Sequence, residues 1–226
     1  MADSDQIQAY RDFYLSDNAG EQSIYHIWED GSGRGNVTTP AQSSPEYREW
    51  MTNHLRELLA SSPDPGLLSL GCGNGKIESG IAAAGGVRVL GVDALEDAVE
   101  LARTRGIDAV CADVLSWTPP PGPWNVIYLD GILGHLYDSD TGQVSHALKR
   151  FRSWLPEGGV MVVSNDPPWD DSEVQVHRDL PYYFLSQKYM QSQVETCDFR
   201  EVTSAVFTYE KPVTGPRDRI VVTART

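Results

Sequence analysis

Short apolar runs alternate with segments of helical periodicity between residues 67 and 164, and this alternation restricts the possible folds more than any other feature of the chain. Runs that are apolar on both faces, as strands of a buried parallel sheet must be, occur at 67–71, 87–92, 108–112, 124–130 and 160–164. Helices are expected between them at 76–84, 95–105 and 140–154. The pattern predicts an α/β fold with a Rossmann-like, mostly parallel sheet and helices on both of its faces.

The segment after residue 165 has a different pattern. One or two helices are expected between 180 and 197, followed by two strand-like runs at 200–210 and 217–226. A connector rich in proline and glycine joins these two runs, which favours an antiparallel pair. We therefore expect a seven-stranded sheet that includes a C-terminal antiparallel strand.

The segment before residue 63 lacks the strand pattern. Ser44 and Pro45 are typical of the N-cap and first residue of a helix, which should end near Ser61, and residues 29–44 are expected to form a loop. We expect residues 1–62 to form an N-terminal helical lid over a Rossmann-like core at residues 63–226. A chain of 226 residues fits one such domain.

The charge and the apolar content exclude several classes of partner. The chain has 32 acidic and 18 basic residues, a net charge of −14, which disfavours binding to nucleic acid. No apolar stretch is long enough for a membrane span, and the N-terminus carries no targeting pattern, so a cytoplasmic protein is expected. The three cysteines lack CxxC spacing, so neither a metal site nor a disulfide is expected. We expect a monomer or a homodimer.

The segment LLSLGCGNGK joins the first predicted strand to a helix through Gly71, Gly73 and Gly75. Glycines at such a turn let the backbone approach a ligand closely. Asp93 ends the second predicted strand, where a carboxylate can accept hydrogen bonds from both hydroxyls of a ribose. A dinucleotide-binding motif would place Gly or Ala at the position of Lys76. The sequence therefore predicts a ligand that contains a nucleoside but is not NAD.

These glycines, Asp93, the sequence Ala112-Asp113-Val114 and the LPEGG segment before the fifth strand occur in the order found in a known family. Over about residues 65–165 the chain resembles the class I S-adenosylmethionine-dependent methyltransferases. The resemblance implies S-adenosylmethionine as cofactor, S-adenosylhomocysteine as product, and a small molecule as methyl acceptor. It also implies a cofactor site formed by Gly71, Gly73, Gly75, Asp93, Leu95, Asp113, Val114 and Asp130.

Within that site the resemblance assigns the ribose to Asp93, the adenine amine to Asp113, and the two faces of the adenine ring to Leu95 and Val114. One position departs from the family, which usually has an acid two residues before the first glycine, where this chain has Ser69. That acid helps to hold the amino group of the cofactor. Either Ser69 does so through water, or Asp130 takes over more of this role.

Three residues are candidates for a catalytic base, which is needed only if the acceptor arrives protonated or as a hydroxyl: His135, Asp130 and Asp166. Asp130 ends the fourth predicted strand, where ligands of open α/β sheets bind. His135 follows shortly after it, and packing of a neutral imidazole beneath the cofactor is the alternative for this residue.

The tetrapeptide at residues 166–169, Asp-Pro-Pro-Trp, resembles the catalytic motif of adenine N6-methyltransferases. Here it follows the fifth predicted strand and not the fourth, and the net charge opposes nucleic acid. Asn165 and Trp169 are therefore candidates to bind a smaller acceptor. The resemblance also makes Tyr183 and four aromatic residues of the N-terminal region acceptor-binding candidates: Tyr10, Tyr14, Tyr25 and Trp28.

The sequence thus predicts an enzyme that transfers the methyl group of S-adenosylmethionine to a nucleophilic nitrogen, oxygen or carbon of a small molecule, in specialised metabolism. Two alternatives remain open from the residues alone. One is an adenine N6-methyltransferase that uses the Asp-Pro-Pro-Trp motif. The other is a protein that binds S-adenosylmethionine without turnover.

Overall fold

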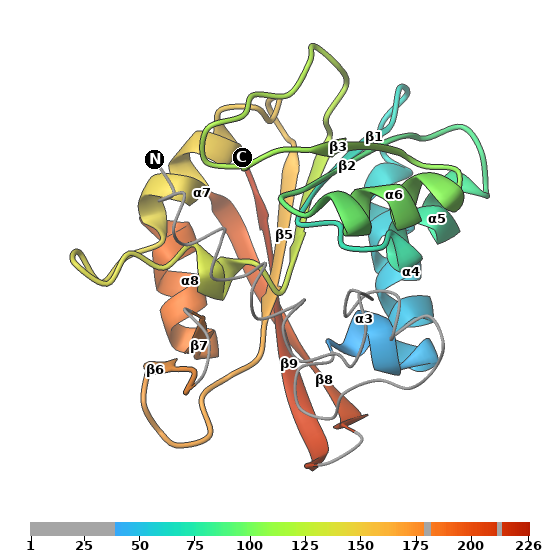
Figure 1. Cartoon of the computed structure of the whole chain (residues 1–226). Helices are drawn as coiled ribbons and strands as arrows, with labels where there is room; N and C mark the ends of the chain where they lie inside the picture. The colour runs from blue at the N-terminus through green and yellow to red at the C-terminus, as the bar shows by residue number, and fades with distance from the viewer. Residues whose placement is uncertain (1–38, 179–181, 212–213) are drawn as a thin grey trace.

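The computed structural model describes residues 39–178, 182–211 and 214–226. Seven strands form one sheet in the order β3-β2-β1-β4-β5-β9-β8 (Figure 1). Their bounds are Gly66–Leu70 (β1), Arg88–Asp93 (β2), Asp108–Cys111 (β3), Val126–Asp130 (β4), Val160–Asn165 (β5), Arg200–Lys211 (β8) and Gly215–Arg225 (β9). The first five pair in parallel, and β9 runs antiparallel to both β5 and β8. The predicted sheet with its C-terminal antiparallel strand is confirmed.

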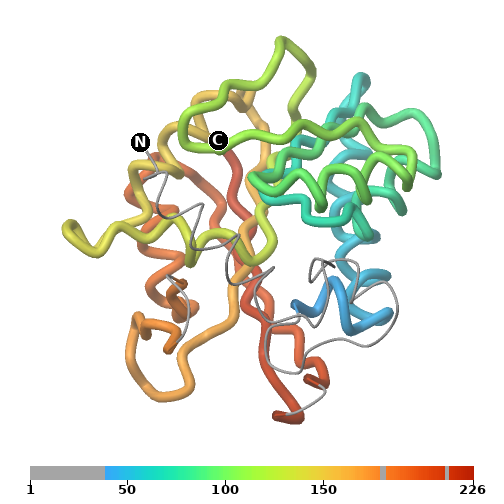
Figure 2. The backbone as a smooth tube through the Cα atoms, viewed as in Figure 1, coloured from blue at the N-terminus to red at the C-terminus, as the bar shows by residue number. Residues whose placement is uncertain are grey.

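Helices cover both faces of this sheet, as predicted (Figures 1 and 2). One face is covered by α4 (Pro45–Leu59), α5 (Lys76–Ala82) and α6 (Glu96–Thr104), and the other by α7 (Ser145–Arg152) and α8 (Gln187–Glu195). The N-cap prediction for α4 is also confirmed, because the Ser44 hydroxyl accepts a hydrogen bond from the backbone amide of Tyr47 at 3.0 Å.

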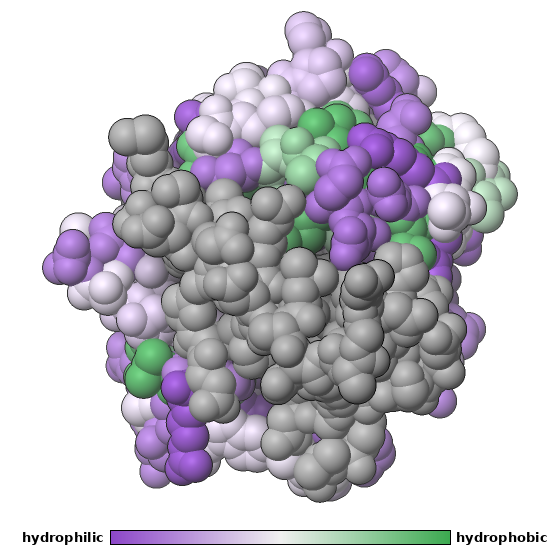
Figure 3. All heavy atoms as spheres, viewed as in Figure 1, coloured by the Kyte–Doolittle hydropathy of each residue, from purple (hydrophilic) through white to green (hydrophobic). Residues whose placement is uncertain are grey.

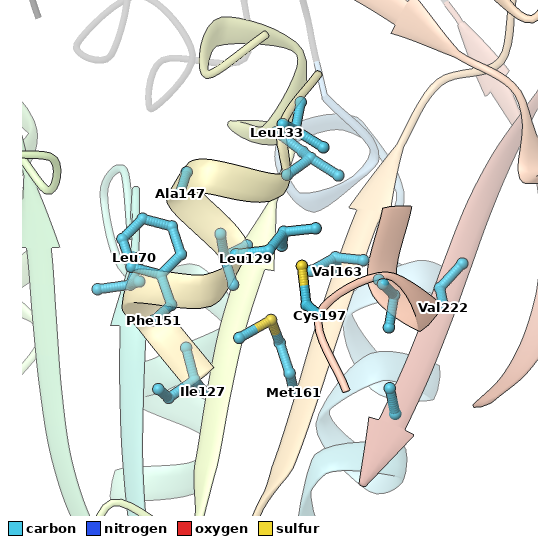
Figure 4. Packing of buried hydrophobic residues seen from close by; sticks show 14 of the residues in the cluster. Leu70, Ile127, Leu129, Leu133, Ala147, Phe151, Met161, Val163, Cys197 and Val222 are labelled. Carbon is cyan, nitrogen blue, oxygen red and sulfur yellow. The ribbon is translucent and has the colours of Figure 1, made fainter. Parts of the chain in front are cut away.

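Two apolar clusters form the core, one on each face, because successive side chains of a strand point to opposite faces. In β5, Val160 and Val162 pack toward α4, whereas Met161 and Val163 join the cluster of α7. Figure 4 shows members of the α7 cluster, among them Leu70, Ile127, Leu129, Ala147, Phe151 and Val222. The strands β1, β2, β4 and β5 are therefore buried on both faces, which explains the continuous apolar runs in their sequences.

The solvent side of α6 shows the complementary pattern. Glu96, Glu100 and Arg103 are exposed, and Figure 3 shows hydrophilic surface over this helix. No helix in the described ranges combines the length and the apolar character required to cross a membrane.

Three local predictions are corrected by the structure. Residues 40–43, predicted as part of a loop, form the short helix α3 (Pro40–Ser43). The predicted helix at 140–154 begins only at Ser145, because residues 138–143 form a turn in which Gly142 has a φ of +67°. The segment Tyr183–Leu185 is a strand, β7, paired with β6 (Val174–Val176), and not the start of a helix.

The β8–β9 hairpin extends beyond the end of β5. The last β5 residue, Asn165, pairs with Ile220, so the residues of β9 before Ile220 pair only with β8. One face of this extension is buried although it is strongly polar, with Tyr209, Lys211, Arg217 and Arg219. The hairpin therefore places three cationic side chains at the carboxyl edge of the parallel strands.

Candidate active site

One cleft opens at the carboxyl ends of β1, β2 and β4, the edge at which open α/β sheets bind ligands. Its walls include the glycine loop after β1, the segment after β3, the loop after β4 and helix α3. Gln42 of α3 and Asn74 of the glycine loop exchange two side-chain hydrogen bonds of 2.7 and 3.0 Å. Helix α3 is thereby fastened to the rim of the cleft.

Glycine is required in this loop for two physical reasons. Gly71, Gly73 and Gly75 all have positive φ, which side chains rarely tolerate. A Cβ atom at Gly71 would also lie 1.9 Å from Cγ2 of Ile132, in the loop after β4. Gly71 and Gly73 line the cleft. Gly75 is not among the lining residues and is the N-cap residue of α5.

Asp93, at the end of β2, lines the cleft and fixes the glycine loop. Its two oxygens accept hydrogen bonds from the backbone amides of Gly73 (2.9 Å) and Leu95 (3.0 Å). Burial raises the pKa of Asp93, and these amide hydrogen bonds oppose that effect. A carboxylate has about four acceptor sites, so two remain for ligand hydroxyls.

The predicted adenine residues lie in the same cleft. Leu95 and Val114 are buried and line it, and Asp113 lines it as well. The Asp113 carboxylate accepts a hydrogen bond from the backbone amide of Leu115 at 2.9 Å, which fixes its orientation. The structure therefore brings Asp93, Leu95, Asp113 and Val114 together.

Asp130, at the end of β4, is held by one oxygen only. Its Oδ1 atom accepts hydrogen bonds from Arg219, from the hydroxyl of Ser164 and from that of Tyr47. Its Oδ2 atom is buried and has no hydrogen-bond partner among the residues that the structure describes. Asp130 lines the cleft, so this oxygen is an unused acceptor in the cleft wall.

Glu78, in the first turn of α5, is a cleft residue that the sequence analysis missed. It is 3% exposed, and the Ser69 hydroxyl donates a 2.6 Å hydrogen bond to its Oε1 atom. Burial raises the pKa of Glu78 to about 7, and repulsion from Asp130 and Asp93 adds to this shift. The signal that could have revealed it was Ser69 itself, which occupies the usual position of an acid.

The hydroxyl of Tyr128, in β4, is a further buried atom of the cleft that has no hydrogen-bond partner within residues 39–178, 182–211 and 214–226. Together with the Glu78 carboxyl and Oδ2 of Asp130, it gives the cleft wall three buried acceptors. Buried polar atoms are normally paired, so unpaired ones need an explanation. These residues fit a cationic group with several donors, such as an amino acid ammonium.

His135 ends the short 3-10 helix η2 (Leu133–His135) and lines the cleft. Its ring meets that of Tyr182 edge to face, with centroids 4.7 Å apart. The structure therefore places His135 in the lining of the same cleft as Asp130.

Asp166 lies outside the cleft lining, although it was predicted as a candidate base. It is buried, with ion pairs to Lys211 (3.1 Å) and Arg219 (2.9 Å). Burial raises the pKa of Asp166, but the charges of Arg219 and Lys211 outweigh burial and hold the pKa below its ordinary value. A carboxylate in this state is a poor proton acceptor, so a role as base is not supported by its surroundings.

The remaining acceptor candidates are not brought together with the cleft. Asn165 is buried, where it accepts a 2.7 Å hydrogen bond from Tyr182 and donates to the carbonyl of Tyr183. Trp169 is 52% exposed and stacks on the Arg217 guanidinium at 3.8 Å. Tyr183 packs against Tyr137 outside the cleft lining. Tyr10, Tyr14, Tyr25 and Trp28 lie outside the described residues.

No group of three or more His, Cys, Asp or Glu side chains in the described ranges is arranged to hold a metal ion.

Comparisons with known proteins identify relatives of the whole chain. The sequence pattern of a family of methyltransferase domains matches residues 44–201. A tabtoxin biosynthesis enzyme of Pseudomonas amygdali pv. tabaci is 32% identical over 210 residues, which cover 90% of this chain and 81% of the relative.

Solved structures share the fold at lower identity. The 1,6-didemethyltoxoflavin-N1-methyltransferase of Burkholderia thailandensis, bound to 1,6-didemethyltoxoflavin and S-adenosylhomocysteine, has a TM-score of 0.69 and 18% identity, over 98% of this chain and 89% of its own. The N-methyltransferase NodS of Bradyrhizobium japonicum, in complex with S-adenosylhomocysteine, has a TM-score of 0.60 and 17% identity, over 90% of this chain and 98% of its own.

Proposed function

The chain belongs to the class I S-adenosylmethionine-dependent methyltransferases, and on this premise we propose that it methylates a nitrogen, oxygen or carbon atom of a small molecule in specialised metabolism. The observation that carries the proposal is the cleft at the carboxyl edge of the sheet. It combines the ribose acceptor Asp93 with unpaired acceptors on Asp130 and Tyr128.

S-adenosylmethionine supplies a methyl group that its sulfonium already activates. The chain's own residues would therefore contribute mainly binding, orientation and exclusion of water. In the proposed arrangement Asp93 accepts hydrogen bonds from the ribose, Asp113 binds the adenine amine, and Leu95 and Val114 contact the ring. The glycine loop lets the backbone approach the methionine part.

Two observations support a small acceptor. The relative with 32% identity functions, by its name, in the biosynthesis of tabtoxin, and the Burkholderia thailandensis enzyme is, by its name, a methyltransferase of 1,6-didemethyltoxoflavin. The net charge of −14 also opposes the counterion release that drives binding to DNA or RNA.

The contacts of Asp166 argue against the adenine N6-methyltransferase alternative. In such a motif the polar residue must accept a hydrogen bond from the substrate amine. Both Asp166 oxygens already bind charged donors, Lys211 and Arg219, and Tyr209 donates to the same carboxylate. We infer that residues 166–169 fix the loop after β5.

We propose His135 as the base for an acceptor that arrives protonated or as a hydroxyl, because its side chain can titrate near neutral pH and it lines the cleft. The ring contact with Tyr182 limits the orientations open to the imidazole. The final position of the acceptor would then lie between this ring and the activated methyl group.

The test is to incubate the purified full chain with S-adenosylmethionine and separate sets of small amines, phenols and heteroaromatic compounds. We expect S-adenosylhomocysteine and a methylated product with at least one set, as measured by mass spectrometry. Oligonucleotides form a further arm, for which we expect neither binding at physiological salt nor product. Product from oligonucleotides alone, or cofactor binding without turnover in every arm, would contradict the proposal.

A further inference from the structure

The side chain of Glu78, in α5, contacts β1 near the carboxyl end of that strand. Position 69 of the strand carries a serine, and its buried hydroxyl donates a 2.6 Å hydrogen bond to Glu78 of α5. The pair places the Glu78 carboxyl in the cleft wall beneath the glycine loop. Position 69 itself is not an acid, but the Glu78 carboxyl lies within hydrogen-bond distance of its side chain.

Lys76, the first residue of α5, lines the same cleft as Glu78. In the part of the chain that the structure describes, however, no lysine, arginine or histidine forms an ion pair with Glu78. The titratable groups that act on it or face it are Asp93 of β2, Tyr128 and Asp130 of β4, and Cys72 of the glycine loop. All of these are acids or neutral groups, so they disfavour a negative charge on Glu78, whereas a positively charged ligand would favour it.

The other acceptors of this wall point to the same kind of ligand. Oδ2 of Asp130 and the hydroxyl of Tyr128 are buried and have no hydrogen-bond partners in the described part of the chain, and both residues line the cleft. An ammonium group offers three donors and one positive charge. It would supply hydrogen bonds to the unpaired atoms and a countercharge to Glu78.

From this geometry, and building on the function proposed above, we propose that Glu78 is the residue that anchors the ammonium group of the methionine part of S-adenosylmethionine, in place of the acid absent from position 69. Asp130 contributes its second oxygen, and Ser69 holds the Glu78 carboxyl in position. The glutamate is thus a binding residue for the cofactor, and Ser69 is a positioning residue.

The proposal implies a proton balance. At neutral pH part of the ligand-free protein carries Glu78 as a neutral carboxylic acid, because burial raises its pKa to about 7. The incoming ammonium keeps its three protons and favours the carboxylate, so the proton of Glu78 leaves to solvent. Near pH 7 we expect a release of about half a proton for each cofactor bound.

The experiment is titration calorimetry of the full chain with S-adenosylhomocysteine at pH 7, in buffers of different ionisation enthalpy. A second ligand, 5′-methylthioadenosine, has the same nucleoside and sulfur but no amino acid part. We expect Glu78→Gln to weaken S-adenosylhomocysteine binding at least about tenfold, to abolish the proton release, and to leave the affinity for 5′-methylthioadenosine unchanged. The double variant Ser69→Asp, Glu78→Gln should recover part of the lost affinity.

Unchanged S-adenosylhomocysteine affinity in Glu78→Gln would overturn the proposal. So would an equal loss for both ligands, because that result indicates a structural role for Glu78. If the unsubstituted chain binds neither ligand, the proposed function fails instead, so the two failures are distinguishable.

Discussion

Arg219 and Asp130 form a buried ion pair in which two nitrogens of the guanidinium contact a single carboxylate oxygen. The same guanidinium binds Asp166 through its third nitrogen at 2.9 Å. One side chain of the C-terminal hairpin therefore holds both an acid of the cleft and an acid of the loop after β5. The other oxygen of Asp130 has no hydrogen-bond partner among the described residues.

Arg219→Met should destabilise the protein by about 3–5 kcal/mol, because it leaves two buried carboxylates without their shared partner. The free energy of unfolding is measured by urea titration. Lys188→Met is the matched control, since the Lys188 pair with Glu173 is exposed to solvent and should contribute little to stability. Equal small losses in both variants would show that the buried network does not stabilise the fold.

Gly71→Ala should cost more than Gly85→Ala, although both glycines have a φ of +73°. The shared backbone conformation should cost about 1 kcal/mol in either variant. Only at Gly71 does the added methyl meet another residue, Ile132, so overpacking should add about 1–3 kcal/mol and weaken S-adenosylhomocysteine binding. Urea unfolding and calorimetry measure the two effects, and equal losses at both sites would argue against the steric explanation.

Asp93→Ala should weaken S-adenosylmethionine binding by about 1–3 kcal/mol, because charge-assisted hydrogen bonds to two hydroxyls are lost. Release of the Gly73 and Leu95 amides should add to the effect. Calorimetry measures the affinity, with Asp97→Ala as a control outside the cleft lining. A folded Asp93→Ala protein with unchanged affinity would remove the ribose assignment.

Glu78→Gln should stabilise the ligand-free protein at pH 8 while leaving its stability at pH 4 nearly unchanged. The pKa of Glu78 in the fold is about 7, above its ordinary value of 4.5, so the folded chain holds a proton that the unfolded chain releases. The free energy of unfolding therefore falls as pH rises through this window, by about 3 kcal/mol in total. Thermal unfolding of both proteins from pH 4 to 8 measures the difference, and parallel curves would contradict it.

His135→Asn should lower the transfer rate and remove an ionisation from the pH profile of kcat, if the acceptor must lose a proton. The comparison is His54→Asn, because His54 hydrogen-bonds Thr223 and does not line the cleft. An unchanged profile in His135→Asn would favour a packing role against Tyr182.

The fold was predictable because each of its central strands is buried on both faces, which leaves a continuous apolar run in the sequence. Asp93 was predictable for a related reason, since the carboxyl end of a strand has a fixed place in an open α/β sheet. The ion pairs of Asp166 could not be predicted, because its partners Lys211 and Arg219 lie 45 and 53 residues further along the chain. Glu78 escaped prediction because its importance depends on the direction of one helical side chain beneath a loop.

The hairpin that carries Arg219 also determines when the site can form during folding. The β1–β2 and β2–β3 pairs join segments that are close in sequence, whereas Arg219 must close an interval of 89 residues to reach Asp130. Contacts over such intervals cost more chain entropy and tend to form late. Asp130 would thus gain its arginine partner only when β9 docks on β5, whereas the contact of Asp93 with the glycine loop needs only β1 and β2.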